Sequence, residues 1–96
     1  NIFTMRGEKT RRPFEFMRAI DQILALQPTT LLPSHGSVVS GSDYIASNML
    51  RIRDAIGWVH DQTVSAMNAG IPLSQLMQTI SLPAHMNLDE SQYDTR

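Results

Sequence analysis

The chain of 96 residues contains no cysteine, which excludes disulfide bridges and any thiolate metal site. It also has no apolar run near the roughly 20 residues that a membrane-spanning helix needs, so no membrane span is predicted. Charge is sparse and balanced, with eight basic residues, nine acidic residues and a net charge of −1. A nearly neutral chain without a basic recognition helix has no general attraction to nucleic acid. The missing cysteines leave the cellular compartment undecided.

Enough apolar sequence is present for one small core, because 42% of the residues are hydrophobic. The chain starts at Asn1 rather than at methionine, and no charged-then-apolar signal region follows. We therefore expect it to be an internal piece of a longer protein.

Apolar side chains recur at three- and four-residue steps along much of the chain, which is typical of amphipathic helices. A first helix is predicted to begin at Pro13, because the missing N–H of proline has no partner in a first helical turn, and to end before Pro28. A longer helix is predicted from about residue 42 to Gly70, which is a suitable left-handed cap. Its apolar stripe comprises Ile45, Met49, Ile52, Ile56, Val59, Thr63 and Ala66.

A short strand is predicted at residues 29–32, where β-branched and aliphatic residues stand next to prolines. A single strand cannot satisfy the hydrogen-bonding groups along its edges, so its sheet partners are expected outside this chain. Residues 34–41 are predicted as a loop, and Ser40 with Asp43 fits a capping box for the long helix. A short helix after Pro72 completes a mainly α chain with one or two short strands, and its apolar face is Leu73, Leu76, Met77 and Ile80.

The three histidines are the first candidates for chemistry. His35 follows the predicted strand on a short loop, which suits a zinc ligand because neutral imidazole is a common metal ligand. No second histidine or carboxylate lies within four residues, so local spacing alone favours an ordinary loop histidine. His60 and His85 are interpreted as packed or hydrogen-bonded residues. Because adjacent positions on a helix diverge, His60 and Asp61 are expected to point in different directions.

A short basic segment near the start of the chain is the second candidate, and it consists of Arg6, Lys9, Arg11 and Arg12. An arginine fork grips a carboxylate, phosphate or sulfate with two parallel hydrogen bonds. Composition alone favours the alternative, a solvent-exposed charge run. No aromatic residues are interleaved with these charges, as binding of single-stranded nucleic acid would require.

Four stretches, taken in order, resemble the alkyl sulfatases of the metallo-β-lactamase superfamily. They are NIFTMRG at 1–7, LLPSHGSVVSG at 31–41, RDAIGWVHDQTVSAMNAG at 53–70 and SLPAH at 81–85. The third stretch is the most specific, whereas the PSH within the second is weak alone. The resemblance implies a parent with an αββα sandwich that holds two zinc ions, followed by a helical dimerisation region. Residues 1–41 are then expected to end the catalytic domain, and residues 42–96 to begin the dimerisation region.

The resemblance also implies roles for three residues. His35 matches the last metal-ligand histidine of the family, and Asn1 and Arg6 match residues that line its sulfate pocket. The other zinc ligands belong to an upstream His-x-His-x-Asp-His motif and to upstream acidic residues, none of which is in this chain, so no catalytic residue is assigned. The segment between Arg6 and His35 is compact compared with some members, so the resemblance does not fix the pocket shape or the preferred alkyl chain.

The resemblance therefore implies a fragment of a zinc-dependent hydrolase that cleaves alkyl sulfate esters to alcohol and sulfate, and that forms a homodimer through its helical region. The fragment alone is expected to be inactive, because catalytic zinc usually has three protein ligands. The alternative is a helical association module of a related hydrolase that acts on another ester or has lost activity. An upstream His-x-His-x-Asp-His motif would distinguish the two.

Overall fold

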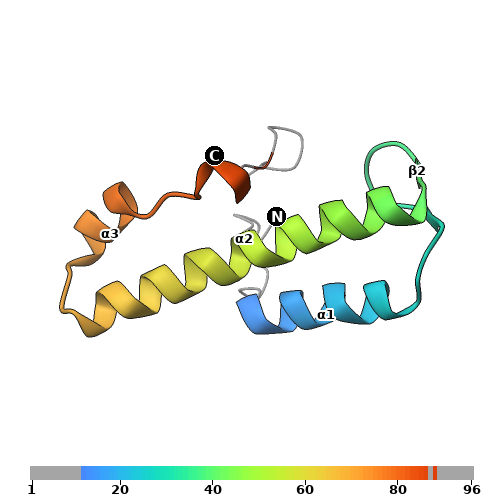
Figure 1. Ribbon diagram of the computed structural model, residues 1–96. Helices are drawn as coiled ribbons and strands as arrows, with labels where there is room; N and C mark the ends of the chain where they lie inside the picture. The colour runs from blue at the N-terminus through green and yellow to red at the C-terminus, as the bar shows by residue number, and fades with distance from the viewer. Residues whose placement is uncertain (1–11, 87, 89–96) are drawn as a thin grey trace.

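The computed structural model describes residues 12–86 and residue 88, and these residues form helices joined by turns and one small hairpin (Figure 1). The elements in chain order are α1 (Pro13–Ala25), β1 (Thr30–Leu31), β2 (Val39–Ser40), α2 (Ser42–Asn68), α3 (Leu73–Thr79) and the 3₁₀ turn η1 (Ala84–Met86). The prediction of a mainly α chain with one or two short strands is confirmed. Asn1 and Arg6 lie outside the described residues.

The long helix α2 is the axis of the molecule, and the other elements pack on it. Figure 1 shows α1 running along the part of α2 nearest the hairpin, and α3 near the far end of α2. The turn η1 also contacts α2. No helix in the described part of the chain combines the length and the apolar character needed to cross a bilayer.

Helix α1 begins and ends where its prolines predict. Pro13 occupies the first helical turn, and the Phe16 amide donates to the carbonyl oxygen of Arg12 at 3.1 Å. The chain leaves the helix at Gln27, which takes a positive φ of 49° just before Pro28. A non-glycine residue in this left-handed region is uncommon, and it turns the chain sharply toward β1.

The predicted capping box at the start of α2 is wrong. The N-cap is Gly41, whose φ of 104° favours glycine, and no side chain caps the helix there. Ser40 belongs to β2 instead, where it pairs with Thr30. The carbonyl oxygen of Gly41 accepts a hydrogen bond from the Ile45 amide at 2.9 Å, so the backbone alone starts the helix.

The end of α2 follows the prediction. Gly70 has a φ of 74°, and its amide donates to the Met67 carbonyl oxygen at 3.0 Å. The Ile71 amide donates to the Ala66 carbonyl oxygen, also at 3.0 Å. These two bonds together form a Schellman cap, which satisfies carbonyl groups that the last turn of a helix leaves open.

The predicted strand has its partner within the chain, which corrects the expectation that its partners lie elsewhere. β1 and β2 pair antiparallel, with Thr30 opposite Ser40 and Leu31 opposite Val39. The amide of Gly41 extends the ladder by donating to the Thr29 carbonyl oxygen at 2.9 Å. The segment predicted as loop therefore contains a strand, because the β-branched Val39 lies opposite Leu31 when the chain turns back.

The core is small and draws on all three helices. Its buried residues are Ile20 from α1, Ile45, Ala55 and Ile56 from α2, and Leu76 from α3. Gly57 marks a close approach of α1 to α2, because a Cβ added there would lie 3.3 Å from the Met17 Cε atom. Most of the predicted stripe of α2 is buried or half-buried, whereas Val59 is 38% exposed.

Candidate functional site

His35 lies in the turn that joins β1 to β2, and its side chain is exposed. The β1–β2 pairing closes the base of the turn. Gly36, which follows His35, has a positive φ of 91° and helps the chain to reverse direction. No atom lies within 4 Å of a Cβ added at Gly36, so glycine is favoured there by its backbone conformation and not by a lack of space. The hairpin thus places an imidazole at the end of a short and well-defined projection.

The two sides of this turn are apolar. Leu32, directly after β1, is 77% exposed, and Val38, directly before β2, is 58% exposed. An ordinary surface turn would carry polar residues at such positions. Exposed apolar residues beside His35 indicate that this end of the hairpin is suited to contact with another surface.

The described residues do not complete a metal site around His35. They contain no group of three or more histidine, cysteine, aspartate or glutamate side chains arranged to hold a metal ion. His35 therefore supplies at most one ligand, whereas a catalytic zinc ion usually takes three from protein. The described donor set therefore does not fit a zinc ion by itself.

The other two histidines lie away from this turn in sequence. His60 is packed and hydrogen-bonded, as predicted: its ring stands 4.4 Å from that of Phe14 in an edge-to-face contact, and its Nδ1 lies 3.0 Å from Asp61 Oδ1. The expectation that His60 and Asp61 point apart is wrong. Their Cα–Cβ bonds diverge, but side-chain torsions bring the imidazole and the carboxylate together. His85 is exposed in η1, and its predicted structural role stays a prediction.

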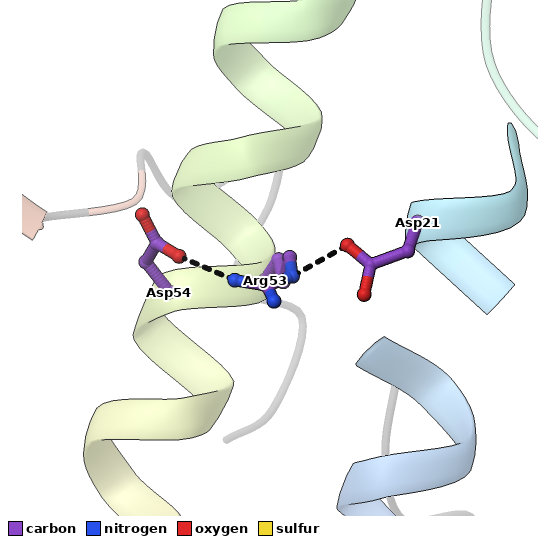
Figure 2. Close-up of polar contacts among 3 residues, drawn as sticks. All are labelled: Asp21, Arg53 and Asp54. Carbon is purple, nitrogen blue, oxygen red and sulfur yellow. Dashed lines mark hydrogen bonds and ion pairs between the residues drawn. The ribbon is translucent and has the colours of Figure 1, made fainter. Parts of the chain in front are cut away.

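Figure 2 shows a charged cluster that the sequence interpretation missed, in which Arg53 stands between two carboxylates. Arg53 Nε lies 2.6 Å from Oδ1 of Asp21 on α1, and Nη1 lies 3.1 Å from Oδ1 of Asp54. Nε is shielded from solvent and has no well-directed hydrogen bond, so its contact with Asp21 is held by charge rather than by N–H alignment. The nearby Asp21, and to a smaller extent Asp54, raises the pKa of Arg53, which stays charged.

The sequence does hold a signal for this cluster, because Asp21 and Arg53 each stand next to a residue of an apolar helix face. Asp21 follows the buried Ile20, and Arg53 follows the half-buried Ile52. Of the basic segment near the start, Arg12 is described. It is exposed and pairs with Glu15 at 3.3 Å, as expected of a solvent-facing charge.

The segment at the far end of the molecule has no charged side chains. No lysine, arginine, aspartate or glutamate occurs in residues 62–88. Leu73 and Met77 of α3 are 72% and 79% exposed, so of the predicted apolar face of this helix only Leu76 is buried. The exposed apolar residues of this segment include Val64 and Met67 of α2 and Leu73 and Met77 of α3. We call these four the α3 patch.

Comparison with known proteins relates the chain to one enzyme. It is 37% identical over 86 residues to the linear primary-alkylsulfatase of Pseudomonas sp. (strain ATCC 19151). The match covers 90% of this chain and 16% of that relative, so the chain spans about a sixth of the relative's length. No protein-family model matches the chain, and no solved structure matches it. The chain is thus related in sequence to one segment of an alkylsulfatase.

Proposed function

We propose that this chain is part of a zinc-dependent hydrolase that cleaves alkyl sulfate esters to the alcohol and sulfate. The observation that carries the proposal is the 37% identity to a linear primary-alkylsulfatase, which extends over 90% of the chain. The exposed turn with His35 and its apolar flanks is consistent with a segment that completes a site built mainly by other parts of a larger protein.

Within this proposal, three residues have assigned roles. His35 provides one zinc ligand, and Asn1 and Arg6 hold the sulfate group of the substrate. Residues 1–41 end a metallo-β-lactamase-like catalytic domain, and residues 42–96 begin a helical dimerisation region. An exposed imidazole on a short hairpin supports the first role, because a ligand that meets others from elsewhere must be accessible. The fragment by itself is expected to be inactive, because its described residues contain no group of three or more side chains that could hold a zinc ion.

The role of His35 is tested by replacing it in the complete protein that contains this chain. His35→Ala is expected to lower the zinc content and the rate of alkyl sulfate hydrolysis together. His85→Ala is the matched control, because His85 is an exposed histidine at the other end of the chain, and it is expected to keep both. Arg6→Ala is expected to keep zinc while losing turnover. An unchanged zinc content in His35→Ala would show that His35 is not a zinc ligand.

We also propose that the helical region forms a homodimer through the α3 patch. Interface cores are depleted in charged residues and enriched in methionine, and residues 62–88 have both properties. The exposed pair Leu73 and Met77 is one turn apart on α3, so a two-fold axis can bring the same face of two copies together. Because the α3 patch has no charged residues, two copies of it can meet without electrostatic repulsion.

The association is tested by placing a charge in the α3 patch of the complete protein. Met77→Glu is expected to weaken dimerisation by about tenfold or more, because the new carboxylate would be buried without a partner. Gln78→Glu is the matched control, since it adds the same charge at the next exposed position of α3 and is expected to leave the dimer intact. Sedimentation velocity measures both. An unchanged dimer in Met77→Glu would show that this surface is not the interface.

A further inference from the structure

The His35 turn is carried by a hairpin that is too short to hold its own orientation. The ladder has two residue pairs, and the Gly41–Thr29 hydrogen bond adds one contact at its base. A two-stranded unit is at best marginally stable alone. Both strands contact α2, and the hairpin connects the end of α1 to the start of α2 (Figure 1). The direction of the turn therefore depends on the contacts of the strands with α2 and on where α1 delivers the chain to β1.

The apolar contact between the two helices does not fix that arrangement closely. Ile20 is the one buried residue of α1, and the neighbouring Phe16, Met17, Ile23 and Leu24 are only half-buried. Apolar burial is non-directional, and the flexible Met17 that lies against Gly57 tolerates small shifts. Apolar packing alone is therefore a weak constraint on a small sliding or rolling movement of α1.

The Asp21–Arg53 ion pair restricts this movement. Asp21 lies one turn before the end of α1 at Ala25, which is the end that leads into the hairpin. The solvent-shielded Nε of Arg53 lies 2.6 Å from Asp21 Oδ1, and a shift of α1 would draw the carboxylate away from the guanidinium charge. Fixing the register between packed elements is a well-attested use of such specific charged contacts.

We infer that Asp21 and Arg53 are positioning residues that set the place of the His35 turn through the register of α1 on α2. Their effect reaches His35 through the last turn of α1 and the β1–β2 hairpin. Asp54 orients the guanidinium from within α2, since it binds Nη1 and leaves Nε to Asp21. The link to catalysis rests on the proposed role of His35 in an alkyl sulfatase.

The test uses hydrogen exchange and kinetics on the complete protein. Arg53→Met removes the charge and keeps much of the side-chain volume, and Asp21→Asn removes the charge of the partner with little change in shape. Both are expected to speed amide exchange across residues 29–41, including the Gly41 amide that bonds Thr29. Alkyl sulfate turnover is expected to fall by about tenfold or more in kcat with KM nearly unchanged, because a small misplacement of a reacting group is costly.

Two further variants separate positioning from a general structural effect. Arg51→Met removes an exposed arginine from the same helix and is expected to leave exchange and turnover unchanged. Arg53→Lys keeps the charge and is expected to restore most of the protection of residues 29–41. An unchanged rate of amide exchange across residues 29–41 in Asp21→Asn would overturn the inference. This result would decide the matter even if Arg53→Met failed to fold. If the unmodified protein hydrolysed no alkyl sulfate, the proposed function would fail, whereas the exchange comparison would still decide the positioning role.

Discussion

Replacing Ile45 by alanine is expected to destabilise the chain by about 3 kcal/mol. Ile45 is only 2% exposed and lies in the first turns of α2, beside the junction with the hairpin. The change removes three buried carbon groups, each worth about 0.8 kcal/mol, and it leaves a cavity that adds to this loss. Because a small domain has only about 5–15 kcal/mol of total stability, the loss is a large share of it.

Urea unfolding measures this loss, with far-ultraviolet circular dichroism and the fluorescence of Trp58 as two probes. Ile45→Val removes a single carbon group and is expected to cost about 1 kcal/mol, which keeps the series measurable if the alanine variant does not fold. Tyr44→Ala is the control, because Tyr44 is 62% exposed, and it is expected to cost within about 0.5 kcal/mol of zero. A loss in Ile45→Ala no larger than that in Tyr44→Ala would refute the described core.

Two further substitutions test the local structure at the far end of the molecule. Gly70→Ala is expected to destabilise the chain by about 1 kcal/mol, because the φ of 74° is strained for alanine although open space surrounds the site; an unchanged urea midpoint would contradict the Schellman cap. Trp58→Phe removes the hydrogen bond from Nε1 to the Ser81 carbonyl oxygen at 3.1 Å, and is expected to cost about 1 kcal/mol and to speed amide exchange in residues 81–86. Equal exchange in this segment would mean that the bond does not hold it on α2.

The helices could be predicted because their signals are local. Apolar periodicity, Pro13 at a first turn and Gly70 beyond a last turn each act within a few residues. The β1–β2 pairing could not be predicted in the same way, because it depends on where the chain returns after a turn. Ser40 shows the difference: its sequence context fits a helix cap, but pairing with Thr30 places it in a strand.

The position of His35 on a loop could be predicted from the sequence, whereas the contacts between charged side chains could not. The loop position of His35 followed from the strand and proline before it, and the structure confirms an exposed turn there. The Asp21–Arg53 contact depends on how far α1 is rotated against α2, which periodicity does not fix. The approach of Asp61 to His60 depends on side-chain torsions, whereas helical spacing rules describe only the directions of the Cα–Cβ bonds.

The burial of the apolar residues of α3 also could not be predicted from their spacing. The spacing of Leu73, Leu76 and Met77 predicts an apolar face, but it does not say what covers that face. In the described structure Leu76 packs inward, whereas Leu73 and Met77 remain exposed. A pattern within one chain cannot distinguish burial in its own core from burial against another surface, which is why the α3 patch became apparent only with the fold.

The most direct test of the proposed function is sulfate release from a linear primary alkyl sulfate by the complete protein, before and after its zinc is removed. We expect the zinc-loaded protein to release sulfate and alcohol in equal amounts, the metal-free protein to be inactive, and added zinc to restore the activity. Absence of sulfate release by the zinc-loaded protein, or full activity after metal removal, would contradict the proposal.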